Sequence, residues 1–104
     1  MIIVNTPNVE GKKIKETLGM VRGSSVRAKW FGKDILAGFK NLVGGEMTTY
    51  MELLEEAREA ALNRMVKDAE KIGADAILNV RFSTSAIAQG AAEILVYGTA
   101  VKFN

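Results

Sequence analysis

The feature that most constrains the fold is a long amphipathic segment over residues 49–72, followed by a glycine and an apolar run. Thr49 and Glu52 have the spacing of a capping box, in which each side chain bonds a free N–H of the first helical turn. Gly73 follows the last apolar residue, where glycine can turn left-handed and end a helix. The pattern predicts one helix about 35 Å long.

Apolar residues cover a broad arc of this helix. The arc consists of Leu53, Leu54, Ala57, Ala61, Met65, Ala69 and Ile72, flanked by Met51, Leu62 and Val66. An arc this wide predicts two burial surfaces, one on the chain's own sheet and one on another element.

Shorter runs on both sides of the helix alternate as strands do. Strands are predicted over residues 2–4, 14–26, 76–84 and 93–103, a short helix over residues 33–43, and loops over residues 8–13 and 85–91. Gly19 and Gly23 predict close approach of a helix to the second strand. Leu78, Val80 and Phe82 are expected to share one face of the third strand. The order β-β-α-α-β-β is typical of an α+β fold with a mostly antiparallel sheet, covered on one face by one short and one long helix.

The last predicted strand is apolar on both faces, although both helices cover the same face of the sheet. Leu95, Tyr97, Val101 and Phe103 alternate with Ile94, Val96, Gly98 and Ala100. A large uncovered apolar face marks an interface. We therefore expect a homo-oligomer closed by point symmetry.

Composition narrows the function further. The length of 104 residues predicts a single domain over residues 1–104. There is no Cys and no His, so thiolate and imidazole chemistry are excluded, and we expect no enzyme. The net charge of +2 is spread along the chain, which argues against nucleic acid as a partner. No apolar run is long enough for a signal peptide or for membrane insertion, so a cytoplasmic location is expected.

The first candidate site binds an anion. Gly44, Gly45, Thr48 and Thr49 precede the long helix, where free amides and hydroxyls can hold a negative charge. The alternative is a helix–helix turn that needs glycine for its dihedral angles. Arg58 lies among apolar positions and is expected to be partly buried, either facing a shared cavity as an anion ligand or pairing with Asp34 or Asp75 in a structural ion pair.

The second candidate site binds a divalent metal. Glu52, Glu55, Glu56 and Glu59 share one helix face, and Glu52 and Glu56 with Asp34 could hold a hard cation such as Mg²⁺ or Ca²⁺. The alternative is a solvated acidic face that suits the helix N-terminus.

Several ordered motifs resemble those of the YbjQ-like family of small bacterial and archaeal proteins, described as "putative heavy-metal-binding". They are Thr6-Pro7 with Gly11, Gly19-x-Val21-x-Gly23, Asp34-x-x-Ala37-Gly38, Gly44-Gly45, Tyr50 with Ala57-Arg58, Gly73-Ala74-Asp75-Ala76-Ile77, and Gly98-Thr99-Ala100-Val101. The resemblance implies a dodecin-like subunit and a ring-shaped homo-oligomer, with a pentamer as the expected stoichiometry. The family description points to a metal, but the chain has no Cys or His ligand for a soft one, so the cofactor stays open, with a divalent metal as one alternative.

Two functions follow from these expectations. The first is a homo-oligomeric module that binds a small ligand or a metal between subunits or in a central cavity. The second is a ring-shaped scaffold without a ligand. A binding module predicts that Arg58, Asp34 or residues 44–49 line a pocket, whereas a scaffold predicts that these groups are paired internally.

Overall fold

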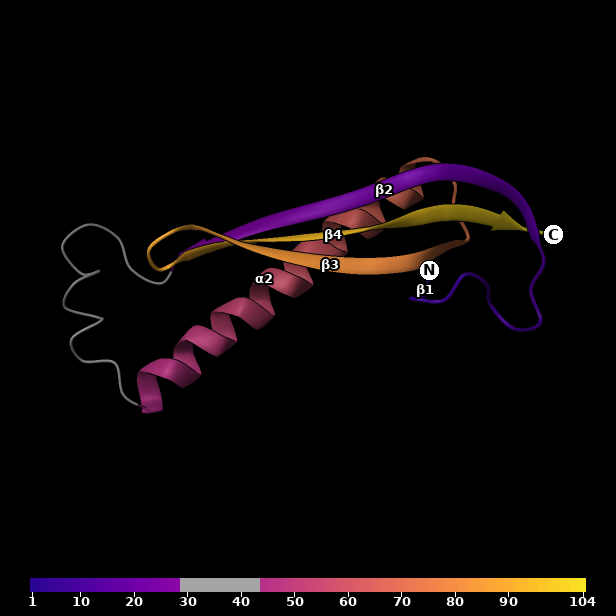
Figure 1. Cartoon of the computed structure of the whole chain (residues 1–104). Coiled ribbons are helices and arrows are strands. Elements are labelled where there is room, and N and C mark those ends of the chain that lie inside the picture. The colour runs from indigo at the N-terminus through magenta and orange to yellow at the C-terminus, as the bar shows by residue number, and fades with distance from the viewer. Residues whose placement is uncertain (29–43) are drawn as a thin grey trace.

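The structure is a computed structural model that describes residues 1–28 and 44–104, and its elements are labelled in Figure 1. They are β1 (Ile2–Ile3), β2 (Ile14–Ala28), α2 (Gly44–Lys71), β3 (Ala76–Ala88) and β4 (Ala91–Phe103). The strands form one sheet in the order β1-β3-β4-β2, in which β1 is parallel to β3 and the other pairs are antiparallel. The α+β class is confirmed. The described order is β-β-α-β-β, because the short helix expected over residues 33–43 lies outside the described residues.

The long helix is confirmed, but its start is different. It begins at Gly44, five residues before the predicted cap at Thr49, so Thr49 and Glu52 lie inside the helix and do not cap it. Its end is as predicted. Gly73 has a φ of 77°, its N–H donates to the carbonyl of Glu70, and the N–H of Ala74 donates to the carbonyl of Ala69. These two bonds satisfy helix carbonyls in the manner of a Schellman motif.

The helix packs directly on β2 at Gly23. A Cβ atom added at Gly23 would collide with the carbonyl oxygen of Ala61 and would lie 2.5 Å from the backbone nitrogen of Met65. The prediction that Gly23 makes room for a helix is therefore confirmed. The same prediction for Gly19 is wrong: nothing lies within 4 Å of an added Cβ there, and its φ of 120° coincides with a register shift in β2. Gly19 is a bulge residue.

A second bulge lies at Asn79 in β3. Asn79 has a φ of 53°, and the register with β4 shifts between Leu78 and Arg81. The extra residue reverses the alternation, so Leu78 and Val80 lie in different apolar clusters. The expectation that Leu78 and Val80 share one face is wrong, because a strict period of two assumes an unbroken ladder.

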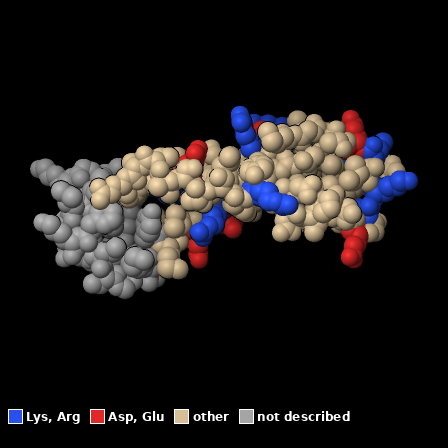
Figure 2. All heavy atoms as spheres, viewed as in Figure 1, with Lys and Arg blue, Asp and Glu red and all other residues tan. Residues whose placement is uncertain are grey.

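The hairpin of β3 and β4 is longer than expected. Both strands extend into the predicted loop over residues 85–91, and only Gln89 and Gly90 form the turn between Ala88 and Ala91. Residues 82–92 contain no charged side chain. The half of the sheet that ends at this turn, called the distal half here, forms the mostly uncharged arm in Figure 2.

Two apolar clusters lie on opposite faces of the sheet. The larger one joins α2 to the sheet and contains Val21, Ala57, Ala61, Met65, Ala69, Ile77, Val80, Ile94, Val96 and Ala100. On the face opposite α2, called the outer face here, Val4 and Val9 of the N-terminal segment pack against Ala76, Leu78, Val101 and Phe103. This segment covers only the half of the outer face farthest from the β3–β4 turn. The last strand is therefore apolar on both faces, as predicted, but the second face is partly covered by the chain itself.

The chain is elongated for its length. Its principal extents are 56 × 22 × 16 Å and its radius of gyration is 17.3 Å, compared with about 13 Å for a compact domain of about 100 residues. Figure 1 shows that the first turns of α2 diverge from the sheet. No helix among the described residues combines the length and apolarity that crossing a bilayer requires.

Substitution of Gly23 by Ala should strongly destabilise the chain. The new methyl group meets backbone atoms of α2, which cannot move aside without shifting the helix, so we expect a loss of about 3 kcal/mol in the free energy of unfolding. This corresponds to a fall of roughly 10–20 °C in Tm, measurable by circular dichroism. Ser24→Ala, at the exposed neighbouring position, is the control and should change stability by less than about 0.5 kcal/mol. Equal melting curves for the two variants would contradict the close approach.

The bulge at Asn79 makes a second prediction. Asn79→Val places a β-branched residue at positive φ and should cost about 1–2 kcal/mol in urea unfolding. Asn79→Gly, which accepts this conformation, should stay within about 0.5 kcal/mol of the parent chain. If valine were tolerated as well as glycine, the bulge would not be present in solution.

Candidate functional site

A cleft lies at the edge of β2 that faces away from β4, where α2 crosses the strand. It has a volume of about 710 Å³ and is lined by Arg22, Gly23, Ser24, Arg64, Asp68, Glu93 and Leu95. Gly23 brings the backbones of β2 and α2 together, and this contact places Arg64 and Asp68, one helical turn apart, beside the strand. We call this the edge cleft.

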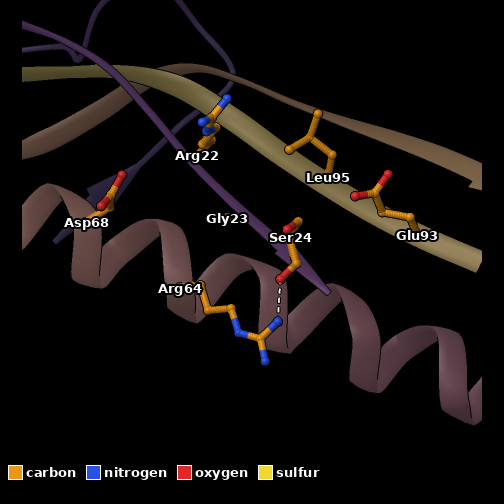
Figure 3. Close-up of a pocket in the computed structure, with 7 residues that line it drawn as sticks. All are labelled: Arg22, Gly23, Ser24, Arg64, Asp68, Glu93 and Leu95. Atoms are coloured by element: carbon orange, nitrogen blue, oxygen red, sulfur yellow. Dashed lines mark hydrogen bonds between the residues drawn. The ribbon is translucent and has the colours of Figure 1, made fainter. Parts of the chain in front are cut away.

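The two arginines of the edge cleft lie on different sides of β2. The Nη1 atom of Arg64 donates a hydrogen bond to the carbonyl oxygen of Ser24, on the side of β2 where no other described strand pairs with it. Figure 3 shows this bond below the strand, with Arg22 above it next to Leu95. Arg64 therefore fixes the helix to the strand edge, while the guanidinium of Arg22 is exposed.

The charges of the edge cleft are balanced. Arg22 and Arg64 supply two positive charges, and Asp68 and Glu93 supply two negative charges. Next to the cleft, the hydroxyl of Ser25 is buried and accepts a hydrogen bond of 2.8 Å from Nη1 of Arg27. The site is a polar groove around a strand edge, suited to a small polar ligand that carries charges of both signs.

The predicted anion site is not assembled within one chain. Gly44 is the first residue of α2, and Gly45, Thr48 and Thr49 follow within the helix, so the expected turn is helical. Arg58 lies 14 residues after Gly44, which is about 21 Å along the helix axis. Arg58 is also exposed, and the expectation that it is partly buried is wrong for the single chain. The apolar arc is simply narrower than the sequence suggested at this turn.

The predicted ion pair between Arg58 and Asp75 does not form within one chain. About 20 Å of helix separates Arg58 from Lys71, and Asp75 lies beyond that end. Instead, Oδ2 of Asp75 accepts a hydrogen bond of 2.8 Å from the backbone N–H of Phe103. Asp34, the other predicted partner, lies outside the described residues.

Of the predicted metal ligands, Glu52 and Glu56 lie one turn apart on α2, and Asp34 lies outside the described residues. Glu52 and Glu56 are exposed on α2, and with Glu55 and Glu59 they line a shallow groove on the helix surface. Residues 1–28 and 44–104 contain no group of three or more acidic side chains that could hold a metal ion. The chain has no Cys or His, and Met65 is buried in the core, so the described donor set does not fit a soft heavy metal.

The residues of the edge cleft were not among the predicted site residues. Their signal in the sequence is indirect: Gly23 marked the close approach of a helix, and any cleft between a strand and a helix begins where the two meet. Which turn of the helix lies there depends on packing, so Arg64 and Asp68 could not be assigned.

Comparison with known proteins places this fold in a family. A family model described as "putative heavy-metal-binding" matches residues 1–104. A UPF0145 protein of Methanosarcina acetivorans is 63% identical over 102 residues, covering 98% of this chain and 96% of that protein. A UPF0145 protein of Archaeoglobus fulgidus is 58% identical and covers 100% of this chain and 96% of its own length.

A solved structure shares the fold. It is the crystal structure of a protein of the DUF74 family from Pediococcus pentosaceus, with a TM-score of 0.62 and 19% identity, covering 100% of this chain and 98% of that one. At this identity the likeness concerns the fold alone. The family model matches residues 1–104 and the relative from Methanosarcina acetivorans is 63% identical, so the chain belongs to the YbjQ family.

Proposed function

We propose that the chain is a homo-oligomeric module that binds a small polar ligand in the edge cleft, with a neighbouring subunit closing the cleft. The observation that carries this proposal is the cleft of about 710 Å³ beside an unpaired strand edge, with two guanidinium groups and two carboxylates at its wall. An open groove in one subunit becomes a ligand site when a second subunit covers it. A ring, with a pentamer as the expected stoichiometry, supplies that cover.

The extended shape supports assembly. The radius of gyration is 17.3 Å, and within residues 1–28 and 44–104 the distal sheet and the first turns of α2 diverge from each other. Phe82 and Ile87 are about half exposed on β3, whose edge from Arg81 onward pairs with no other described strand. Soluble chains seldom leave such an edge open.

A soft heavy metal is not part of this proposal, because the chain offers neither thiolate nor imidazole. A hard cation held by Glu52, Glu56 and Asp34 from one or more subunits is the remaining metal hypothesis. We propose neither catalysis nor nucleic-acid binding. We propose a cytoplasmic location.

A scaffold without a ligand is the second candidate. One observation favours it: the guanidinium of Arg64 already donates to the carbonyl of Ser24, as expected for an internally satisfied group.

Native mass spectrometry of the untagged protein separates the two candidates. The binding module should appear as an oligomer that carries a reproducible extra mass, and Arg64→Ala should lose that mass without changing the number of subunits. Lys67→Ala, an exposed position on the same helix, is the control and should keep it. An oligomer without extra mass, both as purified from cells and after incubation with cell metabolites, would favour the scaffold. A monomer at micromolar concentration would contradict both the binding module and the scaffold.

Titration with Zn²⁺ tests the metal hypothesis. Without thiolate or imidazole ligands, calorimetry should detect only weak binding, with a dissociation constant of about 10⁻⁴–10⁻³ M as for weak carboxylate sites. Micromolar binding that disappears in the double variant Glu52→Gln and Glu56→Gln would contradict this expectation and would restore a metal site on α2.

A further inference from the structure

The uncovered half of the outer face carries a row of three cationic and aromatic side chains. Tyr97 of β4 is paired in register with Arg22 of β2 on one side and with Arg81 of β3 on the other. All three are exposed, Tyr97 by 37%. We call this row the arginine strip.

The arginine strip is a defined surface. Side chains at directly paired positions of an antiparallel sheet lie close enough to touch, so each guanidinium can stack against Tyr97. Nη1 of Arg81 is held in place by the carbonyl oxygens of Asn5, at 3.0 Å, and of Val80, at 3.1 Å. The next row toward the β3–β4 turn is neutral, with Leu95 between Ser24 and Ser83. The strip is therefore positive with an apolar centre.

The complementary surface is on α2. Glu52, Glu55, Glu56 and Glu59 are all exposed on the turns that diverge from the sheet, on the side of the helix away from the buried Ala57 and Ala61. We call this the acidic face of α2. From Glu52 to Glu59 it extends about 10 Å along the helix axis. The two arginines of the strip are two strand spacings apart, which is also about 10 Å.

These two surfaces cannot meet within one chain. The acidic face points away from the sheet on the side that α2 covers, whereas the arginine strip lies on the opposite face of the sheet. Contact between them requires a second copy of the chain, arranged head to tail. A head-to-tail contact repeats from copy to copy and generates a ring when the rotation closes.

We propose that the arginine strip of one subunit docks on the acidic face of α2 of the next subunit. The inference rests on the assembly in the proposed function and names the surfaces that make it. Paired charges fix the register of such a contact and reject other partners, while Tyr97 and Leu95 supply the apolar centre.

Charge reversal tests this interface. The double variant Arg22→Glu and Arg81→Glu should place like charges opposite each other and weaken assembly at least about 100-fold, as measured by sedimentation and native mass spectrometry in low salt. The double variant Glu55→Lys and Glu59→Lys should weaken it similarly and reverses only exposed helix positions, so it is informative even if the strip variant is unstable. Combining all four reversals in one chain should restore the parent stoichiometry.

The control is Lys12→Glu with Lys15→Glu, which makes the same change in net charge at exposed positions outside the strip. It should assemble like the parent chain. If the parent chain is oligomeric and both reversal variants assemble normally, the interface is wrong while the proposed assembly stands. If the parent chain is monomeric, the proposed assembly itself fails.

Discussion

The contact between α2 and β2 at Gly23 is the constraint on which the rest of the structure depends. The helix backbone lies directly on the strand backbone, because Gly23 has no side chain and the helix presents Ala57, Ala61 and Ala69 on the same side. Small residues allow the helix to pack at a short distance from the sheet, so Met65, Val21 and Val96 are fully buried in a thin core. The same contact positions Arg64 to bind the strand edge and so creates the edge cleft.

The helix covers the sheet unevenly. Its second half packs on β2 and β4, while its first turns diverge, and the N-terminal segment covers only part of the opposite face. The surface that is left exposed includes the positive arginine strip, the acidic face of α2 and the uncharged end of the β3–β4 hairpin. Such a division is economical if these surfaces are contacts between subunits, since a single subunit then needs to bury only the part of its sheet that its neighbours do not reach.

The sequence predicted the elements better than the details that position side chains. The helix over most of residues 44–71, its end at Gly73 and the alternation of β4 all follow from local patterns, because each depends on residues close in the chain. The bulge at Asn79 does not. Nothing adjacent to Asn79 signals positive φ, and the bulge is held by pairing of its N–H with the carbonyl of Thr6, more than 70 residues earlier.

The candidate site shows the same limit. Glu52 and Glu56 were correctly placed on one helix face, since helical periodicity alone determines that. Arg22, Arg64 and Glu93 come together only because β2, α2 and β4 meet in space, and no spacing in the sequence records such a meeting. Within one chain, Arg58 lies far from Gly44 and Gly45, because the expected turn at residues 44–49 is part of the helix, which separates Gly44 from Arg58 by about 21 Å.

The pairing of β1 with β3 has a consequence for the order of events during synthesis. Val4 and Val9 are made early, yet they have nothing to cover until Ala76, Leu78 and Val101 have left the ribosome. Such long-range contacts form late in folding. Because the carbonyl oxygen of Asn5 also accepts a hydrogen bond from Arg81, the arginine strip is organised only after the N-terminal segment has docked on the sheet. A chain still being made therefore does not present the finished strip, so the proposed interface can form only between folded subunits.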